Sequence, residues 1–359
     1  MPNRANHASI SRRTFLATAG FGFIGGALAL AGCGAQATTS SSAAASGAAA
    51  TSSASTGDLK TIRIGYAGDV ANVKLEYSTG IAHDQGFLEE ELKKAGYKPE
   101  YTGFPQAGPA INEAFAGGSI DVAQYSEMPA ITVRSKGVDV KAFAVCDSRQ
   151  AFAILASDKS GVQSVADLKG KQIAVAFGTV PQRYLLLELQ KAGLTDKDVQ
   201  LTNVAAQDAP TMVATAGVDA CAGMFTIIHE NEKKGGSHII ATSIDDPSLS
   251  TTSIFFGRAE FLKENRDAAV AIVRALKKAY DYAQKNPDDA RKILASAGTP
   301  ADAVNIEFAD NSFPGFNPQI TDEVRQKYQG VEQFLRDNQL IATDVSIDDL
   351  VDTSIYQDA

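Results

Sequence analysis

One stretch of the chain, residues 104–133, has the order of elements expected of a βαβ unit. A predicted strand over 99–104 leads through a Gly/Pro turn into a predicted helix over 110–116. A short apolar strand over 120–125 follows, and a second helix begins at Pro129. Strands connected in this way are parallel, and such sheets bind ligands at the carboxyl ends of their strands. The stretch therefore predicts an α/β fold.

The same pattern returns in residues 205–228. The matching positions, in order, are Gln106 with Gln207, Pro109 with Pro210, and Gly118–Asp121 with Gly217–Asp219, where one residue is deleted. One supersecondary unit has thus been used twice. The repeat predicts two similar α/β lobes that face each other across a cleft.

The beginning of the chain carries export signals. Arg12-Arg13 and the residues around them form a twin-arginine pattern, and an apolar run over 21–30 follows. This run is shorter than the roughly 20 residues that a membrane-spanning helix needs. The sequence Leu-Ala-Gly-Cys that ends at Cys33 resembles a bacterial lipobox. Residues 1–32 are therefore predicted to be a lipoprotein signal peptide, and Cys33 to carry the lipid.

Residues 33–58 are rich in Ala, Ser, Thr and Gly, a composition typical of a flexible tether. The predicted signal contains three positive and no negative charges, so its removal changes the net charge from −9 to −12. An acidic chain without basic blocks argues against a nucleic-acid partner. No later stretch resembles a transmembrane helix, and the chain is expected to be a membrane-tethered monomer on the extracytoplasmic face.

Two crossings between the lobes are predicted, at residues 151–156 and 253–256. The first lobe is then residues 59–149 with 253–359, and the second lobe is residues 150–252. Helices are predicted at the C-terminal end over 260–285, 288–297 and 321–338, and these are expected to pack on the first lobe.

Signatures of catalysis are absent from the sequence. It contains no G-x-S-x-G, H-E-x-x-H, P-loop or C-x-x-C motif, and its histidines lack the spacing of metal ligands. Cys146 and Cys221 are expected to be buried thiols, although the sequence leaves a disulfide between them open. No enzyme activity, cofactor or metal is therefore predicted.

Several motifs resemble one known family. They are IRIGY at 62–66, GFLEEELKKAG at 86–96, the stretch 104–123, SVADLKGK-x-IAV at 164–175, GTV at 178–180 and VDA at 218–220. Together they resemble the aliphatic sulfonate, nitrate and taurine group of ABC-transporter solute-binding proteins. This resemblance implies a bilobal, type II periplasmic-binding-protein fold with a hinge, and a permease and its ATPase as partners. The family often has tryptophan near residues 221–226, whereas this chain has none.

The predicted binding residues lie where strands lead into helices. Helix N-termini present free N–H groups and a positive partial charge, which bind anions. Gly178-Thr179 is the strongest candidate, with Arg183 on the same helix face; the alternatives are a Thr that only caps its helix and a solvated Arg. The turn at Phe225-Thr226 is mostly apolar. The full predicted set is Tyr66, Asn72, Gln106, Gly108, Ser126, Glu127, Gly178, Thr179, Val180, Gln182, Arg183 and Phe225.

Glu127 is the unexpected member of this set, because a carboxylate beside a bound anion is unfavourable. Either its side chain points away from the solute, or the solute also carries an amine. The sequence therefore predicts a receptor for a small anionic or zwitterionic organic solute, with an aliphatic sulfonate or taurine-like compound favoured. Nitrate, bicarbonate and a thiamine-precursor pyrimidine stay open as solutes. A pyrimidine-synthase-like enzyme and a ligand sensor stay open as functions.

Overall fold

The computed structural model describes residues 58–69, 71–244 and 246–359. The predicted signal peptide, the lipidation site Cys33 and almost all of the predicted tether lie outside the described residues. The described residues belong to one compact unit, Gly57–Ala359. Within them, no helix has both the length and the apolar composition to cross a membrane.

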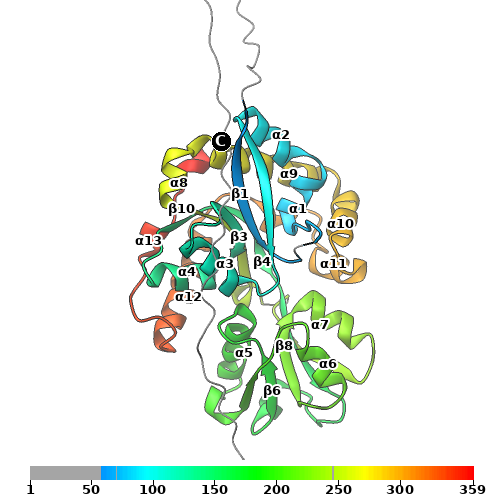
Figure 1. Cartoon of the computed structure of the whole chain (residues 1–359). Helices are drawn as coiled ribbons and strands as arrows, with labels where there is room; N and C mark the ends of the chain where they lie inside the picture. Colours follow the sequence, from blue (N-terminus) through cyan, green and yellow to red (C-terminus); the bar gives the residue numbers. More distant parts are fainter. Residues whose placement is uncertain (1–57, 70, 245) are drawn as a thin grey trace, which may run out of the picture. The chain divides into compact units, whose positions relative to one another are not determined.

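Two five-stranded sheets form the framework of this unit (Figure 1). The first has the order β2-β1-β3-β10-β4 and consists of β1 (Lys60–Ala67), β2 (Tyr97–Phe104), β3 (Val122–Ser126), β4 (Val140–Gln150) and β10 (Thr251–Arg258). The second has the order β7-β6-β8-β5-β9 and consists of β5 (Phe152–Ser157), β6 (Gln172–Val175), β7 (Gln200–Asn203), β8 (Ala220–Met224) and β9 (Ser237–Thr242). The prediction of an α/β fold with two βαβ lobes is confirmed.

The two sheets have matching topologies. In the first, β1 is parallel to β2 and β3, and β10 is antiparallel to β3 and β4. In the second, β6 is parallel to β7 and β8, and β5 is antiparallel to β8 and β9. Each five-stranded sheet therefore combines four strands of one direction with a single strand of the opposite direction, β10 in the first sheet and β5 in the second.

The repeat found in the sequence is also visible in the hydrogen bonds. Asp121 Oδ2 accepts from the backbone N–H of Arg63 at 3.0 Å, and Asp219 Oδ2 accepts from that of Gln172 at 2.9 Å. The backbone N–H groups of both aspartates donate in return to the carbonyls of the same residues, each at 2.9 Å. Each aspartate thus fixes the start of its strand against the neighbouring parallel strand.

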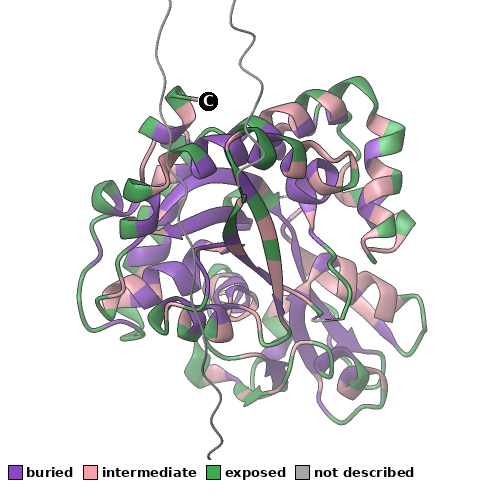
Figure 2. Ribbon diagram, turned by 45° about the horizontal axis from the view of Figure 1, so that its top comes forward, coloured by how far each residue is buried: buried purple, intermediate pink, exposed green. Residues whose placement is uncertain are grey.

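Helices cover both sheets, and the strands are largely buried beneath them (Figure 2). The helices are α1 (Tyr77–Asp84), α2 (Phe87–Lys94), α3 (Gly108–Ala116), α4 (Glu127–Ser135), α5 (Val180–Lys191), α6 (Ala209–Ala214), α7 (Phe225–Glu232), α8 (Ala259–Glu264), α9 (Arg266–Lys285), α10 (Pro287–Ser296), α11 (Ala301–Glu307), α12 (Asp322–Asp337), α13 (Ile347–Leu350) and α14 (Ser354–Gln357). β5 is buried along its whole length and, with the sequence FAILAS, has the nearly continuous apolar composition of a strand covered on both faces.

Two predictions about the elements need correction. The predicted helix over 260–285 is divided at Asn265, whose side chain accepts from the Tyr97 hydroxyl and donates to the Phe261 carbonyl. The predicted crossings at 151–156 and 253–256 are instead strands within the sheets. The predicted C-terminal helices contact elements of the first lobe, as expected: α9 contacts α1 and α2, α10 contacts α1, and α12 contacts α4. The break at Asn265 has a local cause, because an Asn side chain that bonds nearby backbone groups commonly interrupts a helix.

Candidate functional site

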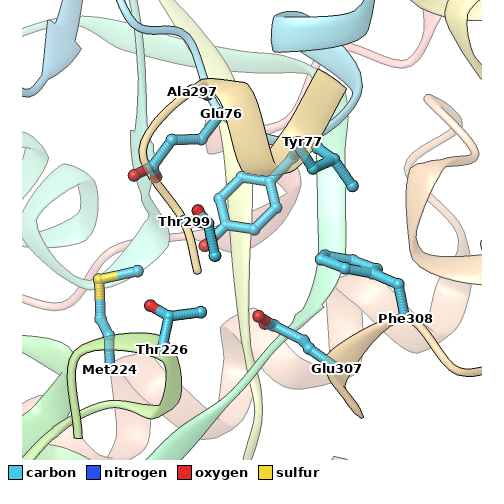
Figure 3. Close-up of a pocket in the computed structure, with 9 residues that line it drawn as sticks. Glu76, Tyr77, Met224, Thr226, Ala297, Thr299, Glu307 and Phe308 are labelled. Atoms are coloured by element: carbon cyan, nitrogen blue, oxygen red, sulfur yellow. The ribbon is translucent and has the colours of Figure 1, made fainter. Parts of the chain in front are cut away.

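A pocket lies where α1 and α7 begin, and α10 and α11 lie beside it (Figure 3). Its lining consists of Glu76, Tyr77, Met224, Thr226, Leu294, Ala297, Thr299, Glu307 and Phe308. The hollow measures about 330 Å³ including its open part, but only about 20 Å³ admits the centre of a water molecule. That is about the space one water needs, so an organic solute requires a more open arrangement of the pocket.

The position of the pocket follows from the topology. α1 follows β1 and α7 follows β8, and each strand is paired in parallel within its own sheet. Carboxyl ends of parallel strands are where α/β sheets bind ligands. The starts of two helices, each following a strand of a different sheet, therefore meet in this pocket.

Glu76 and Tyr77 form the start of α1. Glu76 is the N-cap residue but makes no side-chain capping bond, which leaves its carboxylate available to the pocket. Tyr77 has φ of 58°, a left-handed conformation that is unusual for a residue with a side chain. Such strain is found at ligand sites more often than elsewhere.

The surroundings of the two glutamates in the pocket disfavour the ionised form of their carboxyl groups. Burial raises the pKa of Glu76 to about 7. Burial, followed by the negative charges of Asp147 and Glu76, raises the pKa of Glu307 to about 8, although its bond from the Ala151 N–H opposes this shift. Both glutamates are half-buried by surface exposure. At neutral pH the empty pocket therefore retains protons that ordinary glutamates would have lost.

A second hollow adjoins the pocket and shares Glu307 and Phe308 with it. Asp147 lines this hollow and is only 1% exposed. Its Oδ1 accepts from the Arg149 backbone N–H at 2.9 Å, whereas its Oδ2 has no hydrogen-bond partner among the described residues. Burial raises the pKa of Asp147 to about 6.

The pocket is bonded directly to the segment that joins the two sheets. Gln150 Nε2 donates to the Tyr77 hydroxyl at 2.6 Å, and the Ala151 N–H donates to Glu307 Oε1 at 3.1 Å. The Phe225 N–H donates to the Ala151 carbonyl at 2.9 Å. A movement of the Tyr77 or Glu307 side chain would therefore alter hydrogen bonds of Gln150 or Ala151, which connect the two sheets.

The predicted site residues that follow β1 and β2 mostly serve the protein itself. The buried Tyr66 hydroxyl donates to the Asp69 carbonyl at 2.7 Å and lies 3.3 Å from the Asn72 carbonyl. Asn72 and Gln106 are exposed. None of these three side chains lines the pocket.

Gly108 and Ser126 lie at the starts of helices. Gly108 begins α3 and packs so closely on α4 that a Cβ atom would lie 2.6 Å from the Pro129 Cβ. Ser126 is the N-cap residue of α4, and its hydroxyl makes no capping bond. Gly108 therefore has a packing role, while the Ser126 hydroxyl is not used by its own helix.

Glu127 is bonded within the protein rather than left for a solute. Its Oε1 accepts from the Thr251 hydroxyl, and its Oε2 accepts from the Thr252 N–H at 3.1 Å and hydroxyl at 2.9 Å. The residue is 1% exposed. The carboxylate of Glu127 is therefore satisfied by hydrogen bonds within the protein.

The residues around the start of α5 also bond to one another. The Gly178 N–H donates to Gln182 Oε1 at 2.8 Å, and the Thr179 hydroxyl donates to the Ala176 carbonyl at 2.6 Å. Val180 is buried. As described, the Thr179 hydroxyl proton is therefore not free for an anion.

Arg183 is buried, so the alternative of a solvated arginine is wrong. It is 8% exposed, its guanidinium lies 5.9 Å from the centre of the Phe334 ring on α12, and its Nε has no partner among the described residues. Burial lowers the pKa of Arg183, and the negative charge of Glu127 opposes this shift. The structure thus brings together two predicted residues, Arg183 from the second lobe and Glu127 from the first.

Phe225 is buried and stacks on His229, with ring centres 5.4 Å apart. Its neighbours Met224 and Thr226 line the pocket instead. The turn that the sequence analysis regarded as mostly apolar therefore contributes to the pocket, whereas the predicted aromatic residue itself lies in the core.

None of the residues that line this pocket belongs to the predicted set; its polar members are Glu76, Tyr77, Thr226, Thr299 and Glu307. Glu76 could have been found, because it opens the helix that follows the first strand. No local pattern marks Glu307, the last residue of a helix that the sequence analysis did not predict.

Cys146 and Cys221 are free and buried, as predicted. Burial raises the pKa of each thiol to about 12. Among the described residues, no group of three or more His, Cys, Asp or Glu side chains is placed to hold a metal ion.

Comparisons with known proteins place this geometry in context. The family model described as "NMT1/THI5 like" matches residues 80–290. A Bacillus subtilis (strain 168) protein, whose name proposes aliphatic sulfonate binding, is 26% identical over 331 residues, which cover 92% of this chain and 93% of the relative.

Solved structures share the fold. The structure described as a periplasmic sulfonate-binding protein SsuA from Methylobacillus flagellatus KT has a TM-score of 0.73 and 25% identity, and covers 84% of this chain and 93% of its own. The desulfurization enzyme DSZB has a TM-score of 0.66 and 16% identity, with coverages of 83% and 98%. The same fold thus occurs in binding proteins and in an enzyme.

Proposed function

Because the chain belongs to the NMT1/THI5-like family, we propose that it is the extracytoplasmic solute-binding protein of an ABC importer. A lipid on Cys33 would tether it beside the permease and its ATPase. The observation that carries this proposal is the pocket lined by the start of α1, which follows a strand of the first sheet, and the start of α7, which follows a strand of the second. The named function of the Bacillus subtilis relative and of the SsuA structure supports the same role.

The solute is proposed to be a small organic sulfonate. Its anionic end would approach the start of α5, where Arg183 supplies a buried guanidinium and the helix supplies free backbone N–H groups. Solute entry requires the pocket to open, and closure around the solute would follow by bending where β4 leads into β5 and where β9 leads into β10. The bonds from Gln150 to Tyr77 and from Ala151 to Glu307 would connect occupancy to that bend.

An enzyme on the same fold is the second candidate, since DSZB has this fold. A thiol nucleophile acts as the thiolate, and reactive thiols are accessible groups of lowered pKa. Cys146 and Cys221 have the opposite properties, because both are buried and burial raises the pKa of each to about 12. We therefore favour binding over catalysis.

Thermal-shift measurements on the purified chain would test the proposal. Ethanesulfonate, 2-aminoethanesulfonate, nitrate, bicarbonate and a hydroxymethylpyrimidine would be compared in phosphate buffer, because many common buffers are themselves sulfonates. A ligand that binds only the folded chain raises its melting temperature in proportion to the logarithm of its excess over Kd. A dose-dependent rise with a sulfonate and none with nitrate is expected. A rise with the pyrimidine alone would refute the sulfonate assignment.

Substitution of Arg183 would test the anionic end of the site. Arg183→Ala is expected to weaken sulfonate binding, as is Thr179→Ala to a smaller degree, because the Thr179 hydroxyl is bonded to the protein. Arg274→Ala, at an exposed position of α9, is the matched control. Unchanged affinity in both the Arg183 and the Thr179 variant would remove this end of the site from the proposal.

A further inference from the structure

The helix α12 contacts both places where the chain passes between the two sheets. Lys327 Nζ donates to the Ser148 carbonyl at 2.8 Å and to Ser250 Oγ at 3.1 Å. Ser148 lies near the end of β4, from which the chain leaves the first sheet, and Ser250 lies directly before β10, with which it returns. One ammonium group therefore bonds both connections between the sheets.

The ammonium group of Lys327 is largely withdrawn from water. Its side chain is 13% exposed. Burial lowers the pKa of Lys327, while the negative charges of Glu323, Glu127 and Asp147 oppose this shift. Because a buried ammonium is unfavourable unless its N–H groups are bonded, Lys327 resists any movement that takes Ser148 or Ser250 away from it.

The next residue of α12 adds a contact to the returning strand. The Tyr328 hydroxyl lies 3.1 Å from Thr252 Oγ1, and Thr252 donates through its hydroxyl to Glu127 Oε2. Glu127 begins α4, which contacts α12. Two helices of the first lobe therefore fix the beginning of β10.

The same helix also contacts the second lobe. Phe334 follows Lys327 by seven residues, or about two helical turns, and so lies on the same side of α12. The Arg183 guanidinium of α5 lies 5.9 Å from the centre of the Phe334 ring. Arg183 is buried, and its Nε has no partner among the described residues. A guanidinium is attracted to an aromatic face, so this contact holds α5 against α12.

We propose that α12 holds the two lobes in their compact arrangement, with Lys327 and Phe334 as the positioning residues. A bend between the sheets moves Ser250 away from Lys327 and carries Arg183 away from Phe334, so opening works against both contacts. The free Nε of Arg183 stays available to the anionic end of the solute, and occupancy then favours the same arrangement. This last step rests on the proposed role in solute binding.

The alternative is that α12 only covers the first lobe. Its buried apolar residues Val324, Val331 and Leu335 account for such a covering role. Lys327 and Phe334 instead contact the connections between the sheets and the second lobe. A covering role predicts lower stability without a change in closure. Measurement of closure in the absence of solute therefore separates the two.

The lack of tryptophan in the chain allows a direct measurement of closure. Phe334→Trp keeps an aromatic ring beside Arg183 and provides a single fluorescent reporter. Its emission in the purified full chain would be recorded without solute, alone and combined with Lys327→Met. The matched control is Lys285→Met at an exposed position of α9. Tyr280→Trp, also on α9, reports on the first lobe alone.

We expect Lys327→Met to shift the Phe334→Trp emission to longer wavelength, because the ring becomes exposed when α5 moves away. Lys285→Met should leave that emission unchanged, and the Tyr280→Trp emission should not respond to Lys327→Met. Lys327→Arg keeps a charged donor and should restore most of the parent emission.

Solute affinity should change together with closure. Ethanesulfonate should bind Lys327→Met up to about tenfold more weakly, because the competent closed fraction falls and one bond to a charged group is worth about that factor. A shift of the emission without binding of any sulfonate would support the role of α12 and refute the proposed solute. An unchanged emission with sulfonate binding intact would overturn the role of α12 and leave the proposed function.

Two further measurements guard against a general loss of structure. An equal shift of the Tyr280→Trp emission would indicate loosening of the first lobe and would overturn the inference. If circular dichroism shows that Lys327→Met does not fold, Phe334→Leu replaces it, since this variant leaves the Lys327 bonds in place. X-ray scattering of Phe334→Leu without solute should then give a larger radius of gyration than the parent chain, and an unchanged radius would overturn the inference.

Discussion

Replacing Glu307 with glutamine should make the empty protein more stable at alkaline pH. Burial and the nearby negative charges of Asp147 and Glu76 raise the pKa of Glu307 from 4.5 to about 8. The folded chain therefore holds this proton more tightly than the unfolded chain. Its contribution to stability is fully present below about pH 4.5 and is lost as pH rises through about 8. Glutamine is neutral at every pH and avoids that loss.

The magnitude follows from the shift. At about 1.4 kcal/mol per pKa unit, full ionisation of Glu307 costs at most about 5 kcal/mol. The residue is only half-buried, and opening of the pocket would admit water. We therefore expect about 1–2 kcal/mol at pH 9, which corresponds to about 2–6 °C in melting temperature for a chain of this size.

Scanning calorimetry at pH 5, 7 and 9 would measure this effect, with Glu260→Gln as the control for loss of a surface charge. The difference between Glu307→Gln and the parent chain should grow from pH 5 to pH 9. An equal gain in stability at every pH would indicate that the substitution acts through side-chain packing rather than through loss of the carboxylate charge. No gain at pH 9 would refute the idea that the pocket destabilises its own carboxylates.

Three further predictions concern packing, charge and thiol access. Gly108→Ala should destabilise the chain by about 1–3 kcal/mol in chemical denaturation, because its Cβ would lie 2.6 Å from Pro129; an unchanged midpoint would show that the two helices separate easily. Asp121→Asn should cost about 3 kcal/mol at pH 7 in the same assay, because it removes the negative partner of two arginines; a loss below 0.5 kcal/mol, roughly that of a surface substitution, would contradict this. Cys146 and Cys221 should react with a thiol reagent only on unfolding, since both are buried and burial raises the pKa of each to about 12; rapid labelling of the native chain would contradict their burial.

Much of the framework could be predicted from the sequence because its signals are local. Alternation of apolar and polar residues, Gly turns and the repeated stretches depend only on neighbouring residues, and they located most strands and helices of both lobes. The break at Asn265 was missed, because its Tyr97 partner lies in another element. Likewise, the sequence does not show that the Tyr66 and Thr179 hydroxyls donate to backbone carbonyls, because only the folded turns bring those carbonyls within hydrogen-bond distance.

The pocket shows most clearly which features follow from the sequence and which follow only from the tertiary structure. The sequence alone predicts two repeated α/β lobes, because these follow from the order of elements along the chain. It also predicts that ligands bind where strands lead into helices, because helix ends have unpaired hydrogen-bonding groups. Only the tertiary structure decided which of those turns meet, placing Glu307 of α11 beside Glu76 and Thr226. It also bonded Glu127 to the threonines that begin β10. Long-range packing determines burial and neighbouring charge, and these set which carboxylate is satisfied by the protein and which lines the pocket.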